Sequence, residues 1–383
     1  MVEWKKLGEV CEVLNGFTFK SKEYVPTGIR VIRISDVQSG YISDKDIVFY
    51  PKEKLPEYKR YLLKKGDIVM SLTGNPGRVA CIKENVCALN QRVACLRAKT
   101  TSNSYLYYFF NCKEFESIAF ANSTGGAQKN LSTTWLNNFL IPIPSLEEQK
   151  RIVGILDTFT DSIENLKQQI AQRRKQYEHY RDQLLDLEGK PNEDIKKIGD
   201  YCTMIKGNGV QKTDFVDNGI GCIHYGQIYT HSGPFTYTTN KFVSKEVFEK
   251  ARKASKGDIV MTDTSENVED ICKSVAYLGE DDIAVSNHAL IIKHEQNPKF
   301  LSYSTQTNSF FKQKQKCAYG VKVTGIKPDH LAKFRMFLPP LSEQQRIVSI
   351  LDTFEASISN LEAQLEQRQK QYEYYRNQLL TFE

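Results

Sequence analysis

Residues 144–185 read PSLEEQKRIVGILDTFTDSIENLKQQIAQRRKQYEHYRDQLL, and residues 339–380 read PPLSEQQRIVSILDTFEASISNLEAQLEQRQKQYEYYRNQLL. Aligned without a gap, the two segments are identical at 28 of 42 positions. Self-similarity of this kind inside one chain indicates two copies of one structural unit. This repeat decides the fold, and the rest of the sequence is interpreted around it.

Apolar residues recur in both segments at alternating steps of four and three, starting at Ile152 and Ile347. Five such heptads with polar flanks are typical of a long coiled-coil helix. Because about 150 residues separate the segments, we expect the two helices to pack antiparallel. Ser145 and Glu148 predict a capping box at the start of the first helix. The predicted helix–helix seam consists of Ile152, Leu156, Phe159, Ile163, Leu166, Ile170, Tyr177, Leu184, Ile347, Leu351, Phe354, Ile358, Leu361, Leu365, Tyr372 and Leu379.

The blocks that precede the two helices also repeat, more faintly and at a different shift. Gly66–Met70 (GDIVM) matches Gly257–Met261, and on the same shift Cys81 matches Cys272. The larger shift of the helical segments predicts a net insertion of four residues late in the second block. The chain therefore divides into two variable blocks, residues 1–143 and 191–338, each followed by a constant segment, residues 144–190 and 339–383.

Each variable block reads as a mixture of short strands, helices and turn-rich loops. Val31–Ile34 and Gly66–Leu72 are predicted strands, whereas Tyr105–Cys112 and Ser117–Ala121 are predicted helices. The predicted fold class is α+β: two mixed α/β domains, each followed by a long coiled-coil helix. In this prediction the two helices pack antiparallel and the chain has a pseudo-twofold internal repeat.

Composition and charge narrow the class of protein. No uncharged apolar run approaches the length of a membrane span, and the charged N-terminus lacks the apolar segment of a signal peptide, so we expect a cytoplasmic protein. Nine cysteines without a Cys-x-x-Cys spacing favour reduced, buried thiols. The net charge of +6 is unevenly spread: residues 1–143 carry 20 basic and 13 acidic side chains, and residues 191–338 carry 20 and 17. Two basic blocks are consistent with a polyanionic partner.

The loops of the variable blocks are rich in side chains that bind phosphates and base edges. Arginine is bidentate to guanine, and glutamine or asparagine is bidentate to adenine, so these types are the candidates. At the same shift Glu269 takes the place of Arg78, His224 takes that of Arg33, and His288 falls near Gln91, so we expect the two blocks to read different sequences. The predicted DNA-binding residues are Arg33, Arg78, Gln91, Arg92, Gln128 and Lys129 in the first block, and His224, His288, Lys322 and Lys327 in the second.

Catalytic motifs are missing from the sequence. There is no phosphate-binding Gly-x-x-x-x-Gly-Lys-Ser/Thr and no His-Glu-x-x-His, and Asn75-Pro76-Gly77 lacks the second proline and the aromatic residue of an amino-methyltransferase motif. The six histidines do not pair with repeated acidic partners. We therefore predict no catalytic residue and no metal site in this chain.

The chain resembles the DNA-specificity subunit of type I restriction–modification systems over essentially its whole length. The most specific likeness is the helix entry, IPIPSLEEQKRIVGILD at residues 141–157 and LPPLSEQQRIVSILD at residues 338–352, which occurs twice after two dissimilar basic blocks. The resemblance implies two target-recognition domains, each reading one half of an asymmetric bipartite site in double-stranded DNA. It also implies that the packing of the two helices sets the number of unspecified base pairs between the halves.

The resemblance further implies partners and a division of labour. Two modification subunits, which bind S-adenosylmethionine and methylate adenine, would dock on the helices, and restriction subunits that use ATP and Mg²⁺ would join them. The chain itself would be a non-enzymatic subunit without a bound cofactor. Two other classes of protein stay open at this point: a coiled-coil adaptor for protein targets, and a fused nuclease with its active site hidden in one block.

Overall fold

The computed structural model describes residues 2–83, 86–126, 128–230, 233–320 and 324–382, and for Thr230 only the backbone. It divides into two compact units: unit 1 comprises residues 1–166 and 364–383, and unit 2 comprises residues 167–363. Two 40-residue helices, α6 (Leu146–Leu185) and α12 (Leu341–Leu380), each contribute one end to each unit.

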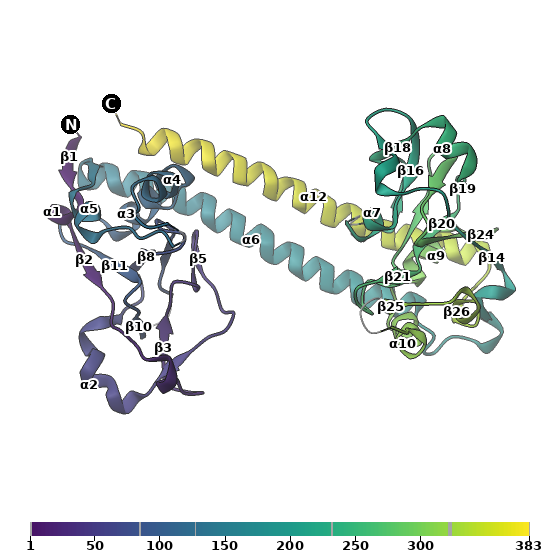
Figure 1. Cartoon of the computed structure of the whole chain (residues 1–383), viewed down its shortest axis with the longest axis horizontal. Helices are drawn as coiled ribbons and strands as arrows, with labels where there is room; N and C mark the ends of the chain where they lie inside the picture. Colours follow the sequence, from purple (N-terminus) through teal and green to yellow (C-terminus); the bar gives the residue numbers. More distant parts are fainter. Residues whose placement is uncertain (1, 84–85, 127, 231–232, 321–323, 383) are drawn as a thin grey trace. The chain divides into compact units, whose positions relative to one another are not determined.

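Unit 1 contains two four-stranded sheets. The first has the strand order β2-β11-β8-β9 and is antiparallel, and the second has the order β6-β3-β10-β7, in which β3 and β10 are parallel. Figure 1 shows the first sheet on the side of the long helices, and β3 and β10 farther from them, towards α2. The bounds are β1 Glu3–Lys6, β2 Cys11–Asn15, β3 Ile29–Ile32, β4 Val37–Gln38, β5 Tyr41–Ile42, β6 Phe49–Tyr50, β7 Leu62–Leu63, β8 Ile68–Ser71, β9 Val79–Cys81, β10 Cys87–Leu89, β11 Val93–Ala98 and β12 Leu140–Ile143.

Short helices cover the first sheet of unit 1, and most follow a side-chain cap. The hydroxyl of Ser102 accepts the N–H of Tyr105 ahead of α3, and that of Ser132 accepts the N–H of Thr134 ahead of α5, which satisfies donors that a helix start leaves free. The strands and helices predicted for this block are present, with bounds that differ from the predicted ones by a few residues. The helices of the block are α1 Leu7–Val10, α2 Leu55–Tyr58, α3 Asn103–Phe110, α4 Lys113–Ala121 and α5 Thr133–Asn138, with single 3₁₀ turns η1 Ser21–Glu23, η2 Lys52–Lys54 and η3 Lys59–Tyr61.

Unit 2 repeats this plan with two five-stranded sheets, β14-β24-β20-β22-β17 and β15-β18-β16-β23-β19. The strands are β13 Ile195–Lys197, β14 Cys202–Lys206, β15 Phe215–Val216, β16 Ile220–Ile223, β17 Phe235–Thr236, β18 Lys241–Val243, β19 Arg252–Ala254, β20 Ile259–Thr262, β21 Thr264–Ser265, β22 Ser274–Tyr277, β23 Ile283–Val285, β24 Ala289–His294, β25 Thr324–Gly325 and β26 Arg335–Phe337. The short helices are α7 Tyr225–Thr230, α8 Lys245–Lys250, α9 Pro298–Ser304, α10 Asn308–Cys317 and α11 Pro328–Leu331, with 3₁₀ turns η4 Asn192–Asp194, η5 Ile198–Asp200 and η6 Lys212–Asp214.

The position of the extra four residues differs from the prediction. In unit 1 Ile68 on β8 pairs with Cys81 on β9, whereas in unit 2 the equivalent Ile259 pairs with Ala276. Cys272 is therefore not the counterpart of Cys81, and the insertion lies directly after β20 rather than late in the block. The match of Cys81 with Cys272 was wrong because a single identical residue in a faint repeat does not fix the strand register. That register is visible only in the structure.

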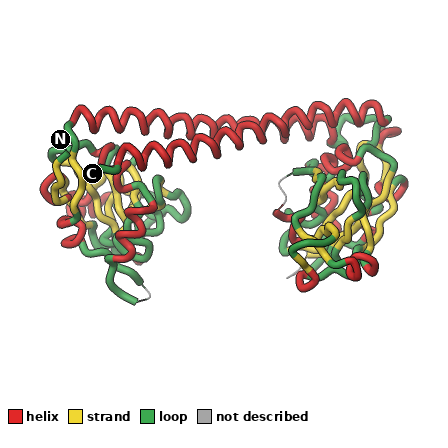
Figure 2. The backbone as a smooth tube through the Cα atoms, turned by 90° about the horizontal axis from the view of Figure 1, so that it is seen from above, coloured by secondary structure: helices red, strands yellow, loops and turns green. Residues whose placement is uncertain are grey.

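The two long helices pair within each unit (Figure 2). In unit 1 the first part of α6 lies beside the last part of α12, where Ile152 and Leu156 are fully buried in a cluster with Tyr372 and Leu379. In unit 2 the last part of α6 lies beside the first part of α12, where the ring of Tyr180 stacks on that of Phe354. The helices therefore run antiparallel in each unit. No helix of the described residues is long and apolar enough to cross a membrane.

Candidate nucleic-acid interface

In unit 1 three loops meet at the end of strand β8. The N–H of Leu72 donates to the carbonyl of Arg92 at 3.0 Å, and the N–H of Gly74 donates to the carbonyl of Lys129 at 2.9 Å. Leu131 closes the arrangement by donating to the carbonyl of Leu72 at 2.7 Å. The structure thus brings together the backbone segments of Arg92 and Lys129, two predicted DNA-binding residues that lie far apart in the sequence.

Arg78 follows these loops on the turn into β9 and is held by a residue that sequence reasoning missed. Its Nη1 donates to Oε1 of Gln38 at 2.9 Å, and Nε2 of Gln38 in turn donates to the carbonyl of Ser35 at 2.8 Å. Gln38 lies in the hairpin of β4 and β5, whose Tyr41 is 58% exposed. A glutamine in a short polar hairpin carries no signal that separates it from other surface residues.

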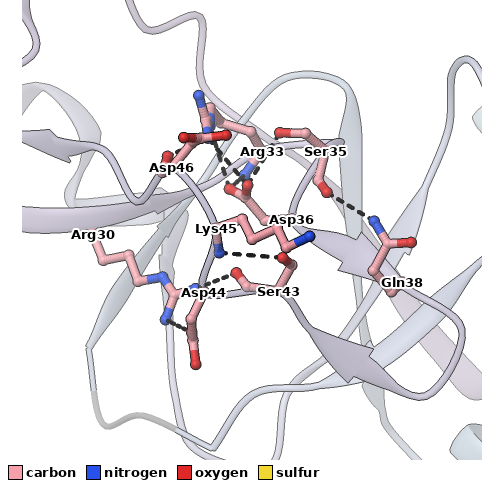
Figure 3. A network of polar contacts seen from close by, with 9 residues as sticks. All are labelled: Arg30, Arg33, Ser35, Asp36, Gln38, Ser43, Asp44, Lys45 and Asp46. Carbon is pink, nitrogen blue, oxygen red and sulfur yellow. Dashed lines mark hydrogen bonds and ion pairs between the residues drawn. The ribbon is translucent and has the colours of Figure 1, made fainter. Parts of the chain in front are cut away.

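Arg33 is the best-anchored of the predicted residues (Figure 3). Its Nε and Nη2 contact the carboxylate of buried Asp36 at 3.3 and 3.2 Å, and Nη2 also donates to the carbonyl of Asp46 at 2.5 Å. Arg30, which the sequence did not single out, donates to the carbonyl of Ser43 at 2.8 Å. Bidentate arginine–carboxylate pairs are among the stronger polar contacts in proteins. The guanidinium of Arg33 therefore holds this loop in place, and its contact with DNA stays a prediction.

The remaining predicted residues of unit 1 differ in exposure. Gln91, Arg92 and Gln128 are exposed, and Oε1 of Gln91 accepts the hydroxyl of Thr18 at 2.5 Å. Lys129 is half-buried, with its ammonium 5.4 Å from the ring centroid of Phe120. Arg92 is thus an exposed basic side chain of this loop cluster.

Unit 2 builds the same loop cluster and repeats two of these backbone hydrogen bonds. The N–H of Asp263 donates to the carbonyl of His288 at 3.3 Å, and Ile326 donates to the carbonyl of Asp263 at 3.1 Å. His288 therefore occupies the place of Arg92, and Asp263 that of Leu72. His288 is exposed. Lys327, another predicted DNA-binding residue, is also exposed and follows β25 by two residues.

The true counterpart of Arg78 is Lys273, not Glu269 as predicted. The N–H of Ser71 donates to the carbonyl of Arg78 at 2.9 Å, and the N–H of Thr262 donates to the carbonyl of Lys273 at the same distance. Nζ of Lys273 also reaches across to the carbonyl of Tyr229 at 2.8 Å. A basic side chain is therefore kept at this position in both units. The four inserted residues displaced the alignment at this point.

His224 takes the place of Arg33, and its surroundings are built in the same way. The N–H of Arg33 donates to Oδ2 of Asp36 at 2.8 Å, and the N–H of His224 donates to Oε1 of Gln227 at 2.6 Å. The imidazole of His224 is only 6% exposed, and burial lowers its pKa, with smaller contributions from Lys212 and His288. Of the other predicted residues of this unit, Lys322 lies outside the described residues.

All of the predicted seam residues are buried or half-buried. Ile152, Leu156, Tyr177, Ile347, Leu351 and Ile358 are buried, and Phe159, Ile163, Leu166, Ile170, Leu184, Phe354, Leu361, Leu365, Tyr372 and Leu379 are half-buried. Arginines interrupt both seams and lie over aromatic rings: Arg368 is 5.6 Å from the ring centroid of Phe159, and Arg173 is 6.0 Å from that of Phe354. Cation–π contact explains how charged residues fit these positions.

The duplicated helix entry joins each long helix to its block through a buried glutamine. Gln149 is 1% exposed, its Oε1 accepts the N–H of Ser102 at 3.0 Å and its Nε2 donates to the carbonyl of Pro144. Gln344 repeats both contacts with Asn297 and Pro339. The described residues contain no group of three or more His, Cys, Asp or Glu side chains that could hold a metal ion.

Comparisons with known proteins give a consistent result. A family model for the type I restriction modification DNA specificity domain matches residues 1–173 and 192–369. A protein of Haemophilus influenzae named as a type I restriction enzyme specificity subunit is 28% identical over 407 residues, which covers 100% of this chain and 96% of that protein. A type I restriction enzyme specificity subunit of Escherichia coli is 28% identical over 409 residues, covering 100% of this chain and 94% of its own length.

Two solved structures share the fold over the whole chain. The S subunit of a type I restriction–modification system from M. genitalium aligns with a TM-score of 0.58 and 13% identity, covering 100% of this chain and 97% of that one. A chain from a structure concerned with complex assembly in the type I system aligns with a TM-score of 0.59 and 17% identity, covering 99% and 96%. Together with the observed elements, they confirm the predicted fold class of two mixed α/β domains, each followed by a long helix.

Proposed function

Because the chain belongs to the family of type I restriction–modification DNA specificity domains, we propose that it reads a bipartite, asymmetric target in double-stranded DNA. In this proposal the loop cluster of each unit contacts one half of the target through the major groove. Membership of the family supports a role in DNA specificity. We further propose that the target is bipartite, that partner subunits assemble on the chain, and that the residues named above touch bases.

A single observation carries the proposal: one loop framework occurs twice with different side chains at its tips. The backbone hydrogen bonds around Leu72 recur around Asp263. The exposed residue whose carbonyl accepts the first of these bonds is Arg92 in unit 1, but His288 in unit 2. Shared framework with changed polar tips is what two readers of different sequences require, because base edges are distinguished by donor and acceptor pattern. The basic excess of both variable blocks supports contact with phosphates.

The proposal assigns the other activities to partners. Two modification subunits, which bind S-adenosylmethionine and methylate adenine, assemble on residues 144–190 and 339–383, and restriction subunits that use ATP and Mg²⁺ join them. The chain then contributes recognition without catalysis, metal or cofactor, and works in the cytoplasm. Residues 1–143 and 191–338 are the two recognition domains in this division.

Methylome sequencing of a host that expresses the chain with its modification subunit tests the proposal. We expect N6-methyladenine at a split motif that is absent from the host without the chain. Exchange of residues 1–143 for another recognition block should alter one half of the motif and leave the other half and the spacing unchanged. A motif that changes in both halves, or the absence of any split motif while the two subunits co-purify, would contradict the proposal.

A further inference from the structure

The connection that follows β8 in unit 1 and β20 in unit 2 has the same ends and different lengths. It begins at Thr73, which bridges to Asn130, and at Thr264, which pairs with Gly325. It ends at Arg78 and Lys273, whose carbonyls accept the equivalent N–H groups described above. Four residues, 74–77, lie between these ends in unit 1, and eight residues, 265–272, lie between them in unit 2. This connection is therefore four residues longer in unit 2.

The helix that packs against the connection carries a different side chain in each unit. Helices α4 and α10 correspond: the side chains of their N-caps, Cys112 and Thr307, accept the N–H groups of buried Phe115 and Phe310. From these matched positions, Ala119 of α4 corresponds to Lys314 of α10. A small apolar side chain under the short connection is thus replaced by a lysine under the long one.

In unit 1 the short connection rests directly on the helix. Gly77 has a φ of +91°, and a Cβ built on it would lie 2.7 Å from Cβ of Ala119. Its counterpart Cys272 keeps the left-handed backbone with a φ of +59°, and both residues donate their N–H to the carbonyl at the end of the preceding strand, Ser71 or Thr262. The backbone path is therefore the same where it leaves the connection, and the extra residues of unit 2 precede it.

In unit 2 Lys314 fills the space between the helix and the longer connection. Its side chain is 7% exposed, and Nζ donates to the carbonyl of Glu269 at 2.6 Å and to that of Ile271 at 2.9 Å. Burial lowers the pKa of this lysine, which reflects the cost of keeping an ammonium group away from water. Both acceptors belong to the longer connection, residues 265–272. The buried ammonium therefore holds the connection through two backbone carbonyls that lie two residues apart.

The remainder of the loop is held by further hydrogen bonds, and two of its acidic side chains are exposed. Asn267 closes a turn with Asp270 through its side chain, and the hydroxyl of Tyr229 donates to the carbonyl of Thr264. Glu266 and Glu269 are exposed. A carboxylate accepts from the exocyclic amino group of cytosine or adenine in the major groove and is repelled by phosphates, so its place in such an interface is opposite an amino-bearing base.

We propose that Lys314 is a positioning residue that fixes residues 265–272 so that Glu266 and Glu269 read a base with an exocyclic amino group in the half-site of unit 2. This inference rests on the proposed function and adds to it a specificity-determining loop. Unit 1, with Ala119 and the four-residue connection, has no equivalent reader in its described loop. The half-site of unit 2 should therefore contain a base preference that depends on Lys314.

Motif mapping with the full chain and its modification subunit tests the inference. Lys314→Met removes the ammonium and keeps much of the volume, and we expect about a tenfold loss of preference at one or two positions of the unit 2 half, with the unit 1 half unchanged. Glu266→Gln and Glu269→Gln should alter the same positions. Lys316→Met on the exposed side of α10 removes the same charge and should leave the motif intact. An unchanged motif in Lys314→Met, or equal loss in both halves, overturns the inference.

A second pair of variants keeps the test decisive if Lys314→Met fails to fold. Glu266→Gln combined with Glu269→Gln leaves Lys314 and its two carbonyl contacts in place, so an unchanged unit 2 half in this variant also overturns the inference. Lys314→Ala combined with deletion of residues 266–269 rebuilds the short connection of unit 1 and should change the unit 2 half alone. If the wild-type chain yields no split motif, the proposed function fails, whereas a wild-type split motif that these variants leave unchanged rejects only the role of the loop.

Discussion

The hydroxyl of Tyr303 on α9 donates a hydrogen bond of 2.8 Å to Oδ1 of Asp352 on α12. Unit 1 repeats the contact, with Tyr108 on α3 donating to Oδ1 of Asp157 on α6 at 2.6 Å. Burial raises the pKa of both tyrosines, with a further contribution from the aspartate that accepts the bond. The aspartate of the duplicated ILDTF sequence is therefore a second anchor of each variable block on its long helix, beside the buried glutamine.

Removal of this hydroxyl should weaken unit 2 measurably. Tyr303→Phe leaves Asp352 paired with Lys299 at 2.7 Å but takes away its neutral donor, and we expect the free energy of unfolding to fall by about 1–2 kcal/mol. Urea unfolding followed by far-UV circular dichroism measures the change. Tyr237→Phe, at a position 58% exposed in the same unit, is the matched control and should be nearly neutral. Equal losses of unfolding free energy in the two variants would show that the Tyr303–Asp352 hydrogen bond does not stabilise unit 2.

A methyl group at Gly77 should be costly for two separable reasons. Gly77→Ala places a side chain at a φ of +91° and brings its Cβ to 2.7 Å from Ala119, so we expect a loss of about 2–4 kcal/mol in the free energy of unfolding. Gly66→Ala has nearly the same φ, +89°, with no atom within 4 Å of the new Cβ, and should cost only the backbone part, about 1 kcal/mol. Identical losses in the two variants would show that α4 moves away freely.

The constant segments could be predicted from the sequence because each local signal agrees with the next. The heptads that start at Ile152 and Ile347 locate both helices, and Ser145 caps α6 as predicted, since its hydroxyl accepts the N–H of Glu148 at 3.2 Å. The reciprocal half of the capping box is replaced by a salt bridge, in which Arg151 binds both carboxylate oxygens of Glu148. A bidentate partner one turn along the helix competes well with a backbone N–H.

The variable blocks could not be matched to each other from the sequence. Their equivalence rests on backbone hydrogen bonds such as those of Arg78 and Lys273, and these leave almost no trace in side-chain identity. One insertion after Thr264 is enough to shift every later pairing. For the same reason Lys314 and Gln38 escaped notice: each is an ordinary surface residue type until the fold places it against a loop.

Unit 2 should lose stability on acidification in part through His294. Burial lowers the pKa of this imidazole, and its Nε2 is buried without a hydrogen-bond partner among the described residues. Below the unfolded-state pKa of about 6.5 the unfolded chain binds a proton that the folded chain does not, so stability falls as the pH drops through this value. Urea midpoints at pH 7.5 and 5.5 should differ less in His294→Gln than in wild type. His330→Gln, which makes the same substitution at an exposed site on α11, is the matched control.

Arg92 should act on one half of the target alone. Its exposed guanidinium occupies the position that His288 takes in the other unit, so Arg92→Ala should relax base preference in the unit 1 half by about 1–3 kcal/mol and leave the unit 2 half intact. Methylation mapping of the variant complex measures the preference. Arg60→Ala, which removes the same charge from an exposed position on η3, is the control for net charge.

Salt dependence then tells a base contact from a phosphate contact at Arg92. If the guanidinium binds a phosphate, Arg92→Ala weakens binding about equally for all sequences and lowers the slope of log K against log salt by about one. If it reads a base edge, the loss is confined to the cognate half-site, because the wrong base already lacks the bidentate acceptor. We expect the second result, since His288 at the same backbone position cannot form that bidentate contact. A uniform loss would move Arg92 from recognition to positioning on the DNA backbone.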